Sequence, residues 1–225
     1  MPSILKIAHR GASGHELENS MASFKKAVEL GADVIEADIQ LTRDDVPIVF
    51  HDKLLDRTSN ASGYTTDFTW SEFESGIRLK NGEKVPTLEE YCLQIKSLKQ
   101  LLYLDLKVFG TEGLILRTCQ KFLNNDQFYF GSFHNHSIRL AKQFDPGITT
   151  VMIIEGNPID MSLVVQNARC DIVAMGFDSI EEDSIPLVQE MDKMVFTWTV
   201  DDPREIARAK SLGVNGITSN FVDRI

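Results

Sequence analysis

Short apolar runs alternate with amphipathic segments along almost the whole chain. Most runs are rich in Val, Ile and aromatic residues, and several are apolar at consecutive positions. This pattern is typical of strands buried on both faces of a parallel sheet, so the runs predict eight β-strands. They cover Ile4–His9, Val34–Ile39, Leu102–Leu106, Phe128–Phe133, Thr150–Ile154, Ile172–Phe177, Val195–Val200 and Gly216–Ser219.

The segments between these runs have the spacing of amphipathic helices. Asn19 or Ser20 can cap the first helix and Gly31 can end it, while Gly213 ends the last. Strands that alternate with helices through short connections predict an α/β fold, a (β/α)8 or TIM barrel, in one domain over residues 1–225. The predicted helices are Asn19–Leu30, Leu88–Ile95, Glu112–Leu123, Ser137–Phe144, Ser162–Ala168, Ile185–Met191 and Arg204–Leu212.

One further run, Pro47–His51, interrupts this alternation. It follows the second strand after five residues, which are too few for a crossover helix. It is therefore expected to return antiparallel as a β-hairpin with Asp44 and Asp45 in the turn. A two-residue turn places His51 opposite Asp38, and a loop one residue longer shifts this pairing by one.

The segment Lys53–Pro86 is the longest stretch without a strong period, and it contains residues typical of loops. It predicts a long loop before the second helix of the barrel. Long loops at the carboxyl ends of barrel strands usually carry ligand contacts. We therefore expect this segment to lie beside the functional site.

Composition limits the partners and the compartment. The 225 residues include 33 acidic and 23 basic ones and carry a net charge of −10, which argues against nucleic-acid or anionic-membrane partners. An anionic small molecule is compatible, because local cations can reverse the field in one cleft. The three cysteines form no CxxC motif or Cys/His cluster, which argues against a zinc site and a disulfide framework. With neither a signal-like segment nor a membrane-length apolar stretch, a cytoplasmic location is expected.

Acidic residues mark the ends of two predicted strands. Glu36 and Asp38 are two residues apart, so on a strand they point to the same side. Asp105 occupies the equivalent height on the next parallel strand. Three carboxylates with open positions suit one hard divalent ion, Mg²⁺ or Ca²⁺. The alternative is a salt-bridge cluster of these acids with Arg10 and Lys107.

Two histidines are expected beside these acids. His9 ends the first strand and His51 ends the hairpin, so the pair can supply an acid and a base near neutral pH. The sequence leaves open which histidine has which role. Arg10 and Lys107 carry charges suited to phosphodiester oxygens, and neutralisation of the carboxylates is compatible with that role.

Other candidates have weaker support. Trp198 ends a strand and can either wall a substrate pocket or pack in the core. His15 is expected in an exposed loop, and His134 and His136 resemble a metal pair but have no acid close in sequence. The chain has no Walker phosphate loop, GxSxG elbow or GxGxxG fingerprint, which excludes the commonest nucleotide-binding and serine-hydrolase classes.

A series of short motifs then runs through the chain in a fixed order. The motifs are His9-Arg10-Gly11, Leu17-Glu18-Asn19-Ser20, Glu36–Thr42, Pro47–Asp52, Leu55-Asp56-Arg57-Thr58, Pro86–Glu90, Ser132-Phe133, Thr197–Val200 and Gly216–Thr218. Taken together, and nearly end to end, the series closely resembles the glycerophosphodiester phosphodiesterase family.

This resemblance implies a (β/α)8 barrel that hydrolyses glycerophosphodiesters to glycerol 3-phosphate and an alcohol. It implies a divalent metal ion held by Glu36, Asp38 and Asp105, and an acid–base pair formed by His9 and His51. It also implies that Arg10 and Asn19 help to arrange the cleft and that Lys107 contacts the phosphate.

The chain departs from the family pattern at three places. Asp105 stands where a glutamate is usual, so the third metal ligand is one methylene shorter. Leu17–Ser20 replaces the usual Pro-Glu-Asn-Thr. Near the end, Ser219–Val222 replaces a motif in which an acid and a proline are commoner, so the last loop is expected to differ.

Two alternative functions compete with hydrolysis of water-soluble glycerophosphodiesters. A phospholipase D-type enzyme acting on lysophospholipids or sphingolipids needs an exposed apolar rim, and the sequence indicates no clear one. A non-catalytic barrel that binds phosphodiesters is the other alternative, and the intact His9, His51, Glu36 and Asp38 argue against it.

Overall fold

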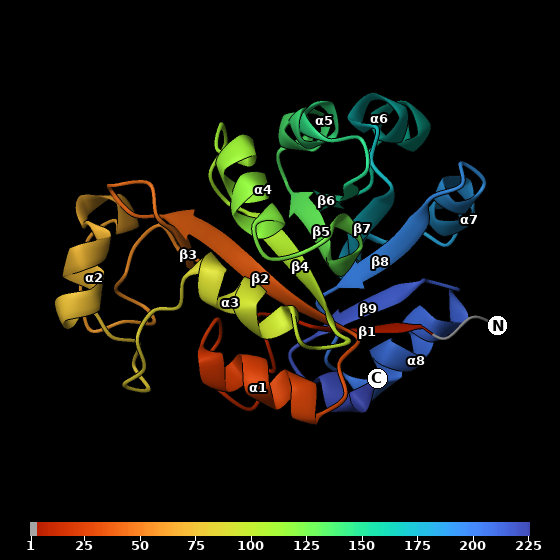
Figure 1. Cartoon of the computed structure of the whole chain (residues 1–225). Helices are drawn as coiled ribbons and strands as arrows, with labels where there is room; N and C mark the ends of the chain where they lie inside the picture. The colour runs from red at the N-terminus through yellow and green to blue at the C-terminus, as the bar shows by residue number, and fades with distance from the viewer. Residues whose placement is uncertain (1–3) are drawn as a thin grey trace.

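The computed structural model describes residues 4–225 and contains a closed barrel of eight parallel strands. Pairing runs around the barrel in the order β1-β9-β8-β7-β6-β5-β4-β2, and β1 pairs with β2 to close it. The helices cover the outside of the strands (Figure 1). The predicted TIM barrel is therefore confirmed. Its strands are β1 (Leu5–Ala8), β2 (Val34–Leu41), β4 (Leu101–Leu106), β5 (Phe128–Ser132), β6 (Thr149–Ile154), β7 (Ile172–Gly176), β8 (Met194–Trp198) and β9 (Gly216–Ser219).

The helices follow the predicted order, with ends shifted by up to three residues. Ser20 caps α1, and its hydroxyl accepts a hydrogen bond from the Ser23 amide. Asn19 precedes this cap with a left-handed φ of 55° and therefore lies outside the helix. The barrel helices are α1 (Met21–Glu29), α3 (Leu88–Ile95), α4 (Glu112–Gln120), α5 (Asn135–Phe144), α6 (Met161–Ala168), α7 (Ser184–Gln189) and α8 (Pro203–Ser211), with short 3-10 turns at η2 (Asn125–Gln127), η3 (Phe177–Ser179) and η4 (Val222–Arg224).

The barrel interior is packed with side chains. Tyr103 belongs to this inner cluster with apolar residues from the other strands. A Cβ atom on Gly131 would lie 2.5 Å from its ring, so a glycine on the adjacent strand makes room for the tyrosine. The filled interior forms the floor of any site built on the strand ends. Among residues 4–225, no helix is long and apolar enough to cross a membrane.

The antiparallel hairpin is confirmed, and its register is the one expected for a loop one residue longer rather than for a two-residue turn. Strand β3 (Pro47–Val49) pairs Leu41 with Pro47, and the Phe50 amide donates to the Asp38 carbonyl, so Asp38 faces Phe50 rather than His51. The loop contains three residues, because Asp45 adopts a left-handed φ of 60°. His51 lies beyond the paired residues, so the one-residue shift still leaves it next to Asp38.

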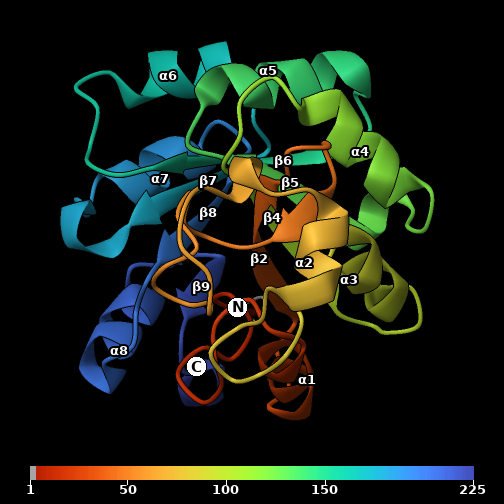
Figure 2. The same cartoon turned by 90° about the vertical axis from the view of Figure 1, so that its left-hand side faces the viewer.

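The segment Lys53–Pro86 is not a simple loop. It contains η1 (Thr65–Asp67), helix α2 (Trp70–Gly76) and a separate apolar cluster around Phe73. The hydrophobic pattern of the sequence did not predict these elements, because it has no strong period here. In Figure 1 it lies beyond the arrowheads of the strands, and Figure 2 looks onto this end of the barrel. The segment therefore borders the end of the barrel where the predicted chemistry lies.

Candidate active site

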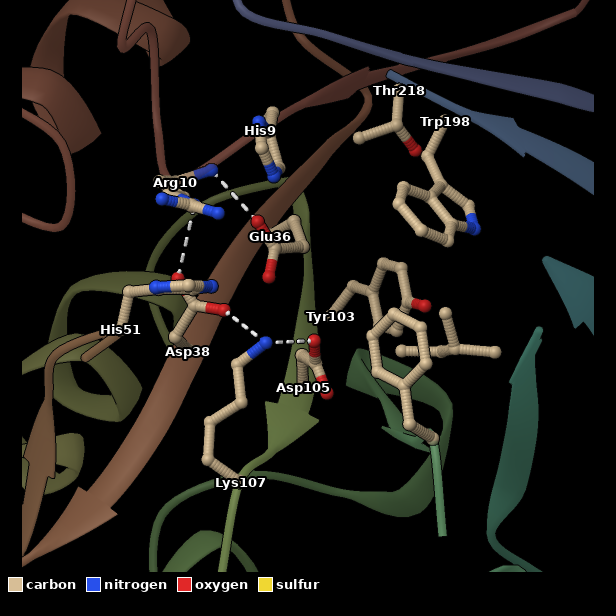
Figure 3. A pocket seen from close by; sticks show the side chains of 12 residues that line it. His9, Arg10, Glu36, Asp38, His51, Tyr103, Asp105, Lys107, Trp198 and Thr218 are labelled. Atoms are coloured by element: carbon tan, nitrogen blue, oxygen red, sulfur yellow. Dashed lines mark hydrogen bonds and ion pairs between the residues drawn. The ribbon is translucent and has the colours of Figure 1, made fainter. Parts of the chain in front are cut away.

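A pocket of about 100 Å³ opens at the carboxyl ends of the strands. Side chains from β2, β4 and the loops after β1 and β3 point into it from several sides (Figure 3). Most residues predicted from the sequence meet here, although they are spread over nearly the whole chain. The pocket is lined by His9, Arg10, Glu36, Asp38, His51, Tyr103, Asp105, Lys107, Phe133, Ile153, Trp198 and Thr218.

Three buried carboxylates form the centre of the pocket. Glu36 and Asp38 lie two residues apart on β2, and the parallel register places Asp105 of β4 directly beside Asp38. One oxygen from each carboxylate lies within 4.8 Å of the others. The acids are 1–5% exposed, so water does little to screen their mutual repulsion.

Two cations contact this acidic group. The Lys107 ammonium is 3.0 Å from Oδ1 of Asp38 and 2.5 Å from Oδ2 of Asp105. The Arg10 Nε atom is 3.2 Å from the other Asp38 oxygen, and the Arg10 amide donates to Glu36 Oε2 over 2.7 Å. These contacts are the salt bridges of the alternative reading, and they leave one negative charge unmatched if all three acids are ionised.

The carboxylates respond unequally to this environment. Burial, followed by repulsion from Asp38 and Asp105, raises the pKa of Glu36 well above its ordinary value. Burial also raises the pKa of Asp105 to about 6, despite the attraction of Lys107. For Asp38 burial is outweighed by Lys107 and Arg10, so its pKa is lowered. A group that lacks positive charge in this way suits an additional cation.

One oxygen atom supports the same conclusion. Asp105 Oδ1 is buried and has no hydrogen-bond partner among residues 4–225. An unpartnered buried carboxylate oxygen is costly unless it binds something else. The donor set consists of oxygens only, which matches hard ions such as Mg²⁺ and Ca²⁺. The residues present therefore fit a divalent ion.

Asn19 is buried and is not among the residues that line the pocket. Its side-chain amide donates to Asp38 Oδ2 over 2.7 Å, and its carbonyl oxygen accepts from the Asp38 amide over 3.3 Å. This paired contact fixes the rotamer of Asp38. The observed contact of Asn19 is thus with a carboxylate of the central group.

A network from the hairpin and the following segment holds His51. The Nδ1 atom of His51 is 2.6 Å from Oδ1 of Asp52, and Arg57 donates two hydrogen bonds to the same carboxylate. Arg57 also donates twice to Glu18, which pairs with Arg10 at 2.9 Å. The bonds from Arg57 are the largest influence on Asp52 and lower its pKa to about 2.

Arg57 received no role from the sequence, although it belongs to one of the motifs quoted above. It links the surroundings of His51 to those of Arg10 through two carboxylates. Only the long-range contact with Glu18, 39 positions away, shows this link. Motif membership was the one signal available in the sequence.

His9 is held by the loop that follows β9. Its Nδ1 atom is 2.8 Å from Oδ1 of Asn220, and the Asn220 amide nitrogen donates to Asp201 over 2.6 Å. Loss of water around the ring, and then the charge of Arg10, lower the pKa of His9 to about 4. Asn220 and Asp201 were also not predicted, because nothing local in sequence connects either of them to His9.

Apolar side chains wall the opposite side of the pocket. Trp198 packs edge-on against Phe133 with ring centroids 5.4 Å apart, and its indole nitrogen donates to the Ala174 carbonyl. Phe133 also lies under the Lys107 ammonium, which is 5.5 Å from its ring centroid. Trp198 thus lines the pocket while its polar atom is satisfied in the barrel.

The weaker histidine candidates lie outside the pocket lining. His15 is exposed and contacts Asp223 at 2.8 Å. His134 and His136 are also exposed, and their rings lie about 6 Å from the ring of Phe109. None of the three belongs to the acidic cluster that could hold a metal ion among residues 4–225.

Comparisons with known proteins show the family to which the chain belongs. The model of the glycerophosphoryl diester phosphodiesterase family matches residues 9–224. A glycerophosphodiester phosphodiesterase of Caldanaerobacter subterraneus subsp. tengcongensis is 31% identical, over 96% of this chain and 93% of that protein.

Solved structures share the fold. A phosphodiesterase of Oleispira antarctica in complex with the product sn-glycerol-3-phosphate has a TM-score of 0.91 at 23% identity, covering 100% of this chain and 95% of that one. A glycerophosphodiester phosphodiesterase of Agrobacterium tumefaciens has a TM-score of 0.86 at 21% identity, covering 99% and 98%. The chain therefore belongs to the glycerophosphoryl diester phosphodiesterase family and is an enzyme that hydrolyses glycerophosphodiesters.

Proposed function

We propose that this enzyme is metal-dependent and uses His9 as general base and His51 as general acid. The observation that carries this proposal is that both rings border one pocket, which also holds three carboxylates and two cations. The two histidines come from different segments and each has its Nδ1 atom engaged. Each therefore has its Nε2 atom left for chemistry.

The metal site in this proposal consists of Glu36, Asp38 and Asp105, with Mg²⁺ or Ca²⁺ as the ion. Oxygen ligands and the unpartnered Asp105 Oδ1 atom support this choice. When bound, such an ion supplies positive charge that stabilises the phosphodiester oxygens as the reaction proceeds. Asn19 keeps Asp38 in the orientation that the site requires.

Arg10 and Lys107 are the proposed phosphate-binding residues. Both line the pocket, and each already contacts a carboxylate there. A phosphodiester oxygen placed among them can accept hydrogen bonds from both side chains. Because these donors are held in place before the substrate arrives, they stabilise developing charge without a large reorganisation.

The two histidine roles follow from their partners. A neutral His9 with its proton on Nδ1 offers a lone pair on Nε2, which can remove the proton of the nucleophile. The nucleophile is either water, which gives glycerol 3-phosphate directly, or the glycerol hydroxyl of the substrate, which gives a cyclic phosphate that water then opens. The Nδ1 atom of His51 faces the carboxylate of Asp52, whose pKa is lowered by the hydrogen bonds from Arg57, so the Nε2 atom of His51 is the one left for the leaving group. Protonated His51 then gives its Nε2 proton to the leaving alkoxide as the bond to phosphorus breaks.

A second hollow next to the pocket offers space for the leaving alcohol of the substrate. It shares His51 and Lys107 with the first pocket and continues along Gln40 and the start of the segment after the hairpin. The alcohol of the substrate is placed there, next to the proposed acid. The glycerol phosphate moiety then occupies the first pocket, the kind of product seen in the Oleispira antarctica complex.

A lysophospholipid substrate is the second candidate. Leu54 lines the second hollow and Phe133 the first, and these side chains are 45% and 43% exposed. They provide apolar surface beside the site that the sequence did not indicate. An acyl chain is the kind of group that such a surface would accept.

The proposal is tested by the purified enzyme with excess EDTA and with Mg²⁺ or Ca²⁺ restored. We expect EDTA to abolish hydrolysis and the ion to recover it, with glycerophosphocholine and glycerophosphoethanolamine preferred over a lysophospholipid. Undiminished turnover in EDTA contradicts the metal site. A clear preference for the lysophospholipid supports the second candidate.

The histidine roles have a separate test. His9→Ala and His51→Ala are each expected to lower kcat by ~10²–10⁴, the usual contribution of a general acid or base. A nitrophenyl phosphodiester needs little protonation of its leaving group, so it should rescue His51→Ala and not His9→Ala. His15→Ala serves as control, because His15 lies outside the pocket. If the nitrophenyl substrate rescues His9→Ala instead, His9 is the general acid and His51 the general base. If both variants keep a kcat above about a tenth of the wild-type value, the two histidines are not an acid–base pair.

A further inference from the structure

The loop after β9 places an amide, not an acid, against His9. The Oδ1 atom of Asn220 is 2.8 Å from Nδ1 of His9, and it also accepts a hydrogen bond from the Ser13 hydroxyl over 2.7 Å. Asn220 belongs to the stretch Ser219–Val222, in which the sequence was expected to depart from the family pattern.

The orientation of the Asn220 amide is fixed from behind. Its Nδ2 atom donates to Asp201 Oδ2 over 2.6 Å, and its backbone amide donates to Asp201 Oδ1 over 2.8 Å. The Ser219 hydroxyl donates to Asp201 Oδ1 over 2.8 Å. Because an ionised carboxylate only accepts hydrogen bonds, Asp201 requires the nitrogen of the amide to face it. The amide oxygen must then face His9.

This orientation determines the proton on His9. An amide oxygen can only accept, so Nδ1 of His9 must be the donor. A neutral imidazole carries one proton, and the Nε2 atom is therefore left with a lone pair. His51 differs, because its Nδ1 atom faces the Asp52 carboxylate directly. For His9, the nearest carboxylate in the series of hydrogen bonds is that of Asp201, which is separated from the ring by Asn220.

We infer that Asn220 and Asp201 are positioning residues that hold His9 as the Nδ1–H tautomer with Nε2 free toward the pocket. The inference rests on the proposed function for its effect on catalysis, since it gives His9 the form that a base needs. Asp201 acts only through Asn220, and neither residue lines the pocket. Their contribution is expected in kcat rather than in KM.

The test compares tautomers and kinetics in the Mg²⁺-supplemented enzyme. With ¹⁵N-histidine labelling, long-range ¹⁵N–¹H spectra distinguish the two tautomers, and the chain has only five histidines. Wild type is expected to show His9 as Nδ1–H. The exchanged pair, Asn220→Asp together with Asp201→Asn, keeps an acceptor for His9 and a hydrogen bond between the two side chains, so it should keep this tautomer. Asn220→Leu removes the acceptor and should give mixed tautomers, with kcat reduced at least ~10-fold and KM little changed.

Two further variants make the test specific. Asp201→Asn no longer forces the orientation of the Asn220 amide, so it should also mix the tautomers, and it covers the case in which Asn220→Leu does not fold. Asn167→Leu, on an exposed face of α6, is the matched control and should behave as wild type.

Two results overturn the inference. One is a His9 that carries its proton on Nε2 in wild type, and the other is an Asn220→Leu variant with wild-type tautomer and kcat. Failure of the proposed function looks different, because His9→Ala would then retain activity while the tautomer measurements still follow Asn220 and Asp201.

Discussion

At the scale of single residues, Asp105 is the unusual member of the carboxylate group. The family resemblance predicts a glutamate at this position, and the aspartate side chain is one methylene shorter. Oδ2 contacts Lys107, while the buried Oδ1 has no partner among residues 4–225. Oδ1 is therefore the Asp105 oxygen that has no contact of its own, and the proposed ion would supply one.

Substitution of Asp105 tests this assignment. Asp105→Asn removes the charge at nearly constant shape, so metal affinity measured by calorimetry should fall at least tenfold. Asp105→Glu restores the usual family residue and is expected to keep substantial activity. Asp126→Asn, on the exposed 3-10 turn η2, provides the control. Unchanged affinity in Asp105→Asn would show that this acid is not a ligand.

At the scale of elements, the segment after the hairpin is a small second core that supports the site. Its buried cluster includes Phe50, Leu55 and Phe73. Phe50 directly precedes His51, and Leu55 lies two residues before Arg57. Burial of these two apolar residues therefore sets the position of the imidazole and of the guanidinium that holds Asp52.

Truncation of Phe73 should weaken the small core that holds Arg57 and His51 in place. Its ring packs against Phe68 and Trp70 and is 2% exposed, so Phe73→Ala is expected to destabilise the segment by about 3 kcal/mol. Hydrogen exchange should then increase in this segment before the barrel, and kcat should fall because Arg57 loses its alignment. Leu93→Ala, which truncates a 47% exposed side chain, is the control. A fully active Phe73→Ala enzyme would show that the segment does not support catalysis.

At the scale of the whole molecule, the buried acids couple stability to pH. In the metal-free protein, Asp105 has a pKa of about 6 and that of Glu36 is also raised, so the folded chain holds these protons more tightly than the unfolded chain. Below their unfolded pKa values, ~4, both states are protonated. As pH rises through about 6, the folded protein must carry buried charge, and its stability falls.

The stabilisation by metal should have the opposite pH dependence. An ion binds the deprotonated carboxylates, so the increase in Tm on adding Mg²⁺ is expected to be larger at pH 7.5 than at pH 5. Differential scanning fluorimetry with and without EDTA measures this difference. An equal shift at both pH values would contradict the coupling between these acids and the ion.

The sequence by itself determined the barrel and the central acids. Buried parallel strands must be apolar on both faces, so polar residues at their ends, such as Glu36, Asp38 and Asp105, stand out. A parallel register then brings Asp38 and Asp105 side by side. His9, Arg10 and Lys107 follow the same rule, because the carboxyl ends of all eight strands meet at one end of the barrel.

Only the tertiary structure decided what holds these residues. The three-residue hairpin loop depends on one left-handed backbone angle at Asp45, and this local choice set the register. Arg57 meets Glu18, and Asn220 meets His9 from 211 positions away. Hydrogen bonds depend on distance and direction in space, and separation along the chain carries no information about either. The apolar pattern could therefore predict where the chemistry lies, while the orientation of each histidine required the folded molecule.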